Sequence, residues 1–140
     1  MGTLDLIRLL GWTTALFFCL AFFNYVVKVV NKRCINKLGK EKKQFVDNYR
    51  KIMKLVIKNH KLFGIIALVT MLIHFYVVFS AHLLRLTGII SALLLLAIVI
   101  LGVYGAFINK NKKGVWLKIH RILPFILLIV IIIHATFRQS

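Results

Sequence analysis

Four of the five histidines in this 140-residue chain form two pairs with the same spacing, His60 with His74 and His120 with His134. In a helix, fourteen residues advance by about 21 Å along the axis, and their total rotation is about 40° less than four full turns. The two imidazoles of each pair therefore project from nearly the same helix face, at different heights. Imidazole nitrogens are common transition-metal ligands, so the spacing indicates two metal-binding levels along a pair of helices.

The elements that carry these histidines are predicted to cross a membrane. The chain is 61% hydrophobic and contains a single proline. Four apolar runs, each near the ~20 residues that a membrane helix needs, lie at about 6–30, 60–81, 86–108 and 115–137. We therefore expect an all-α integral membrane protein, a four-helix up-down bundle that forms one membrane domain over residues 1–140.

The charge distribution predicts how this bundle lies in the membrane. Lys and Arg number 20 against 3 acidic residues, for a net charge of +17. Twelve basic residues lie within 28–61 and five within 110–121, which are the first and third connections. The positive-inside rule places both connections in the cytoplasm and both termini outside, in the cell (cytoplasmic) membrane. No nucleic-acid motif accompanies the charge, so the expected partner of these residues is the anionic lipid bilayer.

The first connection contains a predicted amphipathic helix over residues 44–59, on the cytoplasmic side. Apolar residues recur there at helical spacing, and the basic residues fall on the opposite side. The helix either lies at the membrane interface or continues directly into the second span. A solvated, charged loop is the alternative.

The second and fourth spans run in the same direction in such a bundle. His60 then comes level with His120, and His74 with His134, so the functional pairs lie across the bundle. A haem iron with both axial positions filled by histidine fits two facing imidazoles. Zinc fits less well, because it normally takes four ligands and the acidic residues lie outside the histidine-bearing spans. The chain has no CxxCH motif, so we expect two non-covalent b-type haems between the second and fourth helices.

Small and basic residues near the histidines complete the predicted sites. Close approach to a flat macrocycle favours small residues, although such residues also serve helix packing. The candidates for haem packing are Gly64, Ala67, Gly88 and Gly102. The candidates for propionate contact are Lys61 and Arg121 at the inner haem, and Arg85, Arg138 and His82 at the outer haem. Anchoring to lipid headgroups is the alternative for the basic residues.

On these residues, the chain resembles the di-haem four-helix core of the cytochrome b superfamily over about residues 5–137. That superfamily includes the N-terminal bundle of respiratory cytochrome b and the ferric reductase-like transmembrane domains. The resemblance is carried by His60-x13-His74, His120-x13-His134 and the Gly88/Gly102 pair. The sequence departs from the family in having no quinone-site motif of respiratory cytochrome b and no flavin or nicotinamide domain.

The resemblance implies a minimal di-haem b-type cytochrome that transfers electrons across the membrane. We expect a cytoplasmic or quinol donor and an acceptor on the outer face, with a flavoprotein or iron–sulfur partner on one or both faces. This is an electron-transfer protein or oxidoreductase subunit rather than a self-contained enzyme. The alternatives are a haem-bearing anchor subunit of a larger quinone-linked oxidoreductase, a histidine-lined proton or metal-ion pathway, and a structural assembly subunit. A quinone site, the direction of electron flow, the haem potentials and the oligomeric state stay open.

Overall fold

The computed structural model describes residues 2–109 and 114–137, apart from the side chain of Lys40, and its regular structure is entirely helical. The elements in chain order are α1 (Thr3–Arg33), η1 (Ile35–Lys37), η2 (Lys40–Lys42), α2 (Lys43–Ser80), α3 (Leu86–Val103), the π-helical turn η3 (Tyr104–Ile108) and α4 (Val115–Thr136). Four helices are long and apolar enough to cross a bilayer, the third of these being α3 together with η3. The expectation of an all-helical, multi-pass membrane chain is confirmed at this level.

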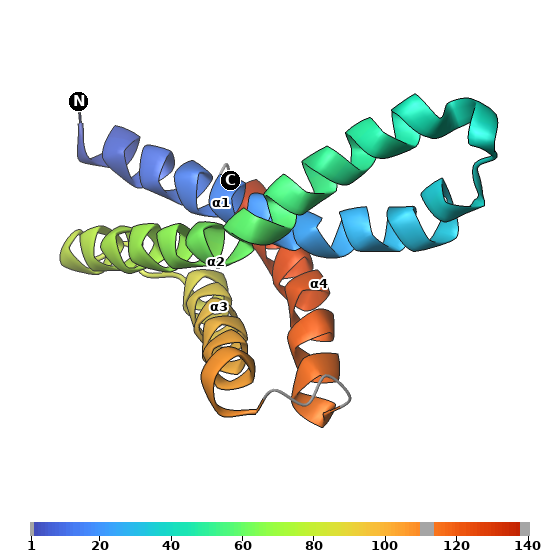
Figure 1. The fold of residues 1–140 in the computed structure, drawn as a ribbon. Coiled ribbons are helices and arrows are strands. Elements are labelled where there is room, and N and C mark those ends of the chain that lie inside the picture. The colour runs from blue at the N-terminus through green and yellow to red at the C-terminus, as the bar shows by residue number, and fades with distance from the viewer. Residues whose placement is uncertain (1, 110–113, 138–140) are drawn as a thin grey trace.

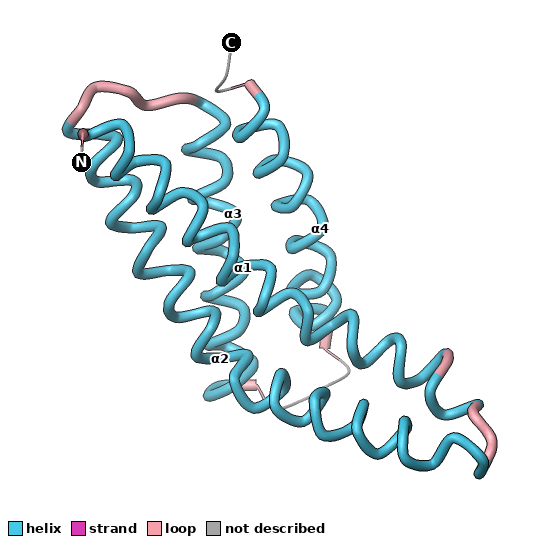
Figure 2. Tube along the Cα trace, turned by 90° about the horizontal axis from the view of Figure 1, so that it is seen from above, coloured by secondary structure: helices cyan, strands magenta, loops and turns pink. Residues whose placement is uncertain are grey.

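The helices form two hairpins, α1 with α2 and α3 with α4, and most tertiary contacts lie within a hairpin. Figures 1 and 2 show the two hairpins crossing one another, with α2 and α4 running in the same general direction. The N-terminus, the α2–α3 connection and the end of α4 lie toward one end of the molecule (Figure 2). The α1–α2 connection and the start of α4 lie toward the other end. The first basic segment therefore adjoins the same end as the start of α4, which carries Lys118 and Arg121.

A small apolar core lies where the hairpins cross. Its buried members are Phe18, Ala67, Met71, Leu95, Ile98 and Leu127, contributed by all four helices. Among the described residues, no polar or charged side chain is fully buried. The outer surfaces carry many exposed large hydrophobic side chains. This pattern suits a protein whose surroundings are apolar, because lipid covers the surface that water would not.

The predicted amphipathic segment is the N-terminal part of α2, which runs unbroken from Lys43 to Ser80. Of the two arrangements expected for it, the structure has the continuous helix. The hydroxyl of Tyr49 donates a hydrogen bond of 2.8 Å to the carbonyl of Val27. Val27 and Val46 are buried beside this bond. The segment is therefore packed on the end of α1.

A tight turn closes the other end of α2. His82 has a φ of 55°, the left-handed conformation in which glycine commonly ends a helix. The amide of Leu83 donates to the carbonyl of Val78 at 3.0 Å, which is the six-residue bond of a Schellman motif. Three residues after His82, Arg85 reaches across to α4 and donates to the carbonyl of Phe137 at 2.7 Å. The turn thus connects the two hairpins at this end.

We expect Leu127→Ala to destabilise the bundle and Ile129→Ala to have little effect. Leu127 is 1% exposed and Ile129, on the same helix, is 59% exposed. Truncating a buried leucine leaves a cavity and costs about 2–5 kcal/mol, whereas lipid or detergent fills the space at position 129. Thermal unfolding of the two purified variants in one detergent checks this. Equal losses of stability would contradict the placement of the core.

Candidate functional site

His60 of α2 and His120 of α4 face each other across the two hairpins. The centres of their imidazole rings lie 6.4 Å apart and the ring planes are inclined by 85°. Both side chains are partly buried. The structure thus brings together the inner histidine pair that the sequence predicts. The two histidines belong to different hairpins, because α2 packs mainly on α1 and α4 mainly on α3.

Backbone carbonyls of the neighbouring helices orient both rings. Nδ1 of His60 lies 3.0 Å from the carbonyl oxygen of Ala21, and Nδ1 of His120 lies 3.0 Å from that of Ile98. A carbonyl can only accept, so each Nδ1 carries the proton and donates. In the neutral ring, Nε2 then keeps its lone pair for a ligand. This is the arrangement that metal-binding histidines adopt, with the second nitrogen tied to a carbonyl or carboxylate.

The separation of the inner rings suits one metal ion between them. Two metal–imidazole bonds take up about 4 Å, at about 2.0–2.1 Å each. The remaining ~2.4 Å of the 6.4 Å between ring centres corresponds to two distances from an imidazole centre to one of its nitrogens. At this separation the two imidazole rings are too far apart to form a hydrogen bond with each other. The distance between the ring centres is therefore compatible with one metal ion bound by both imidazoles.

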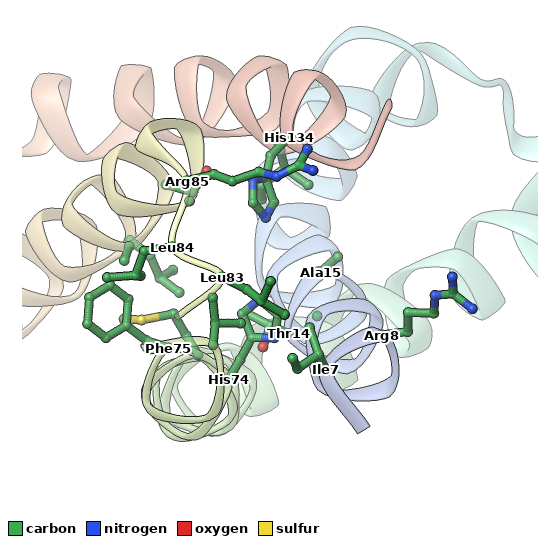
Figure 3. A pocket seen from close by; sticks show the side chains of 18 of the residues that line it. Ile7, Arg8, Thr14, Ala15, His74, Phe75, Leu83, Leu84, Arg85 and His134 are labelled. Atoms are coloured by element: carbon green, nitrogen blue, oxygen red, sulfur yellow. The ribbon is translucent and has the colours of Figure 1, made fainter. Parts of the chain in front are cut away.

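His74 of α2 and His134 of α4 line a common cavity at the other level (Figure 3). Its volume is about 350 Å³, and residues of all four helices border it. Most lining side chains are apolar, among them Phe18, Met71 and Leu127 of the central core. Nδ1 of His134 lies 2.9 Å from the hydroxyl oxygen of Thr87 on α3. This second site is thus a largely apolar chamber with two imidazoles from opposite hairpins.

Three of the four histidines are in contact with a glycine of the adjacent helix. A Cβ atom at Gly88 would lie 3.1 Å from Cε1 of His134, and one at Gly102 would lie 3.3 Å from Cε1 of His120. A Cβ at Gly11 would lie 3.2 Å from Cε1 of His74. Contacts this short leave little room for a larger residue. The sequence singled out Gly88 and Gly102, whose spacing matches the histidines, but did not identify Gly11.

The fourth histidine has tyrosine where the other three have glycine. On α3, the carbonyl of Ile98 accepts the hydrogen bond from His120, and Gly102 lies four residues after Ile98. On α1, the residue four after the corresponding carbonyl of Ala21 is Tyr25. Tyr25 also follows Gly11 by fourteen residues, which is why no glycine repeat marks α1. Its ring packs edge-on against Phe125 of α4, with 5.6 Å between ring centres.

The remaining predicted site residues lie in more varied places. Gly64 has nothing within 4 Å of an added Cβ, and Ala67 is 1% exposed in the central core rather than beside an imidazole. Arg85 borders the outer cavity but bonds the carbonyl of Phe137, and His82 is exposed in its turn. Lys61 lies over the ring of Phe107 at 5.8 Å and Arg121 is exposed, while Arg138 lies outside the described residues.

Each level offers a small set of donor atoms. In the part of the chain that the structure describes, no three side chains of His, Cys, Asp or Glu gather closely enough to hold a metal ion. Two imidazoles alone leave most coordination positions of a transition metal to other donors. The donor set therefore suits a metal that already carries its own planar ligand.

No protein-family model matches the chain, and no curated protein or solved structure is significantly similar to it. The roles of these residues therefore rest on their geometry. That geometry provides two levels, each with one imidazole from α2 and one from α4. Residues of α1 and α3 form the flanks of both levels.

We expect Thr87→Val to change the tautomer ratio of the His134 imidazole. The substitution removes the hydroxyl that bonds Nδ1 and keeps the shape of the side chain. A hydrogen bond of about 0.5–1.5 kcal/mol corresponds to a change of about 2- to 10-fold in the tautomer ratio. Side-chain ¹⁵N NMR of histidine-labelled protein measures this ratio. Thr13→Val is the matched control, because the Thr13 hydroxyl bonds only the carbonyl of Leu9 in its own helix; an equal change in both variants would contradict the assignment.

Proposed function

We propose that this chain is a minimal di-haem b-type cytochrome that transfers electrons across a membrane, of the kind found in the cytochrome b superfamily. The observation that carries the proposal is the inner pair. His60 and His120 face each other at 6.4 Å between ring centres, and each donates through Nδ1 to a backbone carbonyl. Both rings are thereby prepared to bind through Nε2 from opposite sides.

The residues at both levels fit a bis-histidine haem. At each level the two imidazoles would hold the haem iron, and the macrocycle would supply the other donors, which the described side chains do not provide. Glycines at positions 11, 88 and 102 allow the imidazole rings of His74, His134 and His120 to lie close against the adjacent helices. The outer level adds a largely apolar cavity, which favours a planar apolar group over a hydrated ion.

A haem with both axial positions filled supplies a one-electron redox centre without an open coordination position. The chain contributes binding, orientation and exclusion of water. His60 and His120 hold the inner centre, and His74 and His134 hold the outer one, about 21 Å further along each helix. Between the two levels lie buried apolar side chains, including Met71, Leu95 and Leu127. They keep water out of the interval between the centres.

The positive charge sets the proposed orientation. The basic segments adjoin the end of the molecule that carries the inner pair, so this end faces the cytoplasm by the positive-inside rule. Both termini and the outer pair then face the outside of the cell membrane. A flavoprotein, an iron–sulfur protein or quinol donates at the inner level, and an acceptor takes electrons at the outer level. With a negative interior, full outward passage gains about 2.3 kcal/mol per 100 mV.

The first experiment is a dithionite-reduced minus oxidised spectrum with a pyridine haemochrome count. We expect two b-type haems per chain. His120→Ala should remove the inner centre and His74→Ala the outer centre, because each takes one axial ligand from one level only. His82→Asn is the control and should retain both, since His82 is exposed in the turn and asparagine tolerates its positive φ.

The result that would overturn the proposal is a colourless protein under conditions that supply haem during expression. A histidine-lined ion pathway and a structural assembly subunit would then remain. His→Ala variants would abolish ion flux in vesicles only if the chain is an ion pathway. If the single variant His74→Ala were folded but had lost both haems, the pairing of His74 with His134 and of His60 with His120 would be wrong.

The glycine contacts give a second test of the sites. Gly88→Leu places a branched side chain against His134, where even a Cβ would lie 3.1 Å from Cε1. Disturbing the packing around a metal-binding histidine typically weakens binding by about 10- to 100-fold, so we expect loss of the outer centre in the haem count and in the low-spin EPR spectrum. Gly64→Leu, in open space on α2, should retain both centres. Retention of an unchanged outer centre in Gly88→Leu would contradict the site.

A further inference from the structure

The α1–α2 hairpin continues well beyond the level of the inner histidine pair. Residues 43–59 of α2 precede His60, a length of about 25 Å of helix, whereas only residues 115–119 of α4 precede His120. Figure 2 shows this extension passing beyond the facing ends of α3 and α4. Since the inner pair marks one face of the apolar region, the extension lies outside the hydrocarbon core or along its border.

The extension is a packed two-helix element. The bond from Tyr49 to the carbonyl of Val27 joins its two helices, and Val27, Ile35 and Val46 are buried between them. Nearer the tip, Arg50 donates to the side-chain oxygen of Asn36 at 3.2 Å. Its outer surface is therefore presented in a fixed arrangement.

That surface is strongly basic. It carries two acidic residues, Glu41 and Asp47. The exposed basic side chains are Lys28, Lys32, Arg33, Lys37, Lys42, Lys43, Arg50, Lys51, Lys54 and Lys58. Such an excess favours an anionic partner.

An exposed apolar stripe lies on the same helix as many of these charges. Phe45, Ile52 and Leu55 are 58%, 58% and 61% exposed, and their spacing of seven and three residues places them on one face of α2. Exposed apolar side chains also cover the membrane-spanning part of the same helix. They include Leu62, Val69, Leu72 and Tyr76.

The length of helix that carries exposed apolar side chains indicates what covers the first of them. From Phe45 to Tyr76 this length is about 46 Å, whereas the hydrocarbon core is about 30 Å thick. The first three side chains therefore reach the headgroup layer if α2 is inclined in the membrane. Figure 1 shows α1 and α2 crossing α3 and α4 at an angle, which allows this inclination.

The positions of two lysines agree with a headgroup environment. Lys51 precedes Leu55 by four residues and Lys58 follows it by three, so both lie beside the stripe on the helix surface. Lysine at such a border extends its ammonium toward phosphate while its stem covers apolar surface. An acidic protein partner would account for the charge, but the stripe belongs to the same unbroken helix as a membrane span, which places it next to the leaflet.

We propose that the N-terminal part of α2 binds the anionic phospholipid headgroups of the membrane leaflet next to it. Phe45, Ile52 and Leu55 enter the boundary between headgroups and acyl chains, and Lys51 and Lys58 contact the phosphates. The arrangement is that of an interfacial amphipathic helix, here fused to a membrane span and fixed to α1. It holds independently of whether the histidines bind haem.

The test uses the full chain in nanodiscs with a spin label at position 52. The label is attached to Ile52→Cys in a Cys19→Ala/Cys34→Ala background. Nanodiscs contain either phosphatidylcholine alone or a mixture with phosphatidylglycerol, and collisions with oxygen and with a water-soluble nickel chelate report the depth of the label. We expect preferential access of oxygen in the anionic nanodiscs, and a shift toward the nickel reagent in phosphatidylcholine or at high salt.

Paired charge variants identify the residues responsible. Lys51→Gln/Lys58→Gln should lower the ratio of membrane-seated to released label in anionic nanodiscs by about 30-fold, from the contribution of each lysine near an anionic surface. Lys32→Gln/Lys37→Gln removes the same charge away from the stripe and should change the ratio far less. The salt response of the unsubstituted chain tests the same contact without any risk of misfolding.

Either of two results would overturn the proposal. Equal and preferential nickel access in both kinds of nanodisc would show that the stripe faces water, and the basic surface would then belong to an acidic protein partner. Equal effects of the two charge variants would show that net charge, rather than these two lysines, determines the position of the helix.

Discussion

The imidazoles of His60 and His120 are held by carbonyls of Ala21 and Ile98, which belong to the neighbouring helices of their own hairpins. The direction of each histidine is thus set by a bond within its own hairpin. A helix carbonyl already accepts one bond from its own helix, and its second lone pair is free to orient a side chain on the next helix. The facing geometry at 6.4 Å depends on both of these bonds, and so does any ligand chemistry at the inner level.

The apolar environment explains why contacts between the hairpins are few. In lipid, apolar side chains gain little by leaving the outer surface, so close packing and polar contacts must hold helices together. Here α1 packs closely on α2 and α3 on α4, while a small core around Ala67 and Leu127 joins the two hairpins. Under the proposed function, the two haems would add bonds between α2 and α4, the helices that lie in different hairpins. Cofactor binding would then contribute directly to the stability of the bundle.

Much of the fold follows from the amino-acid sequence. Four apolar runs of about 20 residues can only be membrane helices, because backbone polar groups in lipid must be satisfied within the segment. With four alternating spans, the second and fourth run in the same direction, which brings equal histidine spacings to equal heights. The sequence also predicts the amphipathic helix of residues 44–59. It does not decide whether this helix is separate from the second membrane span or continuous with it. Whether a helix continues across a polar–apolar boundary depends on the packing of its neighbours, here the contact of Tyr49 with α1.

The sequence by itself singled out the four histidines, since two identical intervals of fourteen residues on parallel helices bring them to two common heights. Only the tertiary structure decided what touches them. Gly11 adjoins His74, yet no periodicity of the sequence marks this residue. Gly64 shows the converse, because it lies on a histidine-bearing helix and approaches nothing. The spacing of residues along one helix determines how far apart they lie along its axis and which side of the helix they share. Contacts between helices depend on the relative register and crossing angle of the helices, which residue spacing within one helix does not determine.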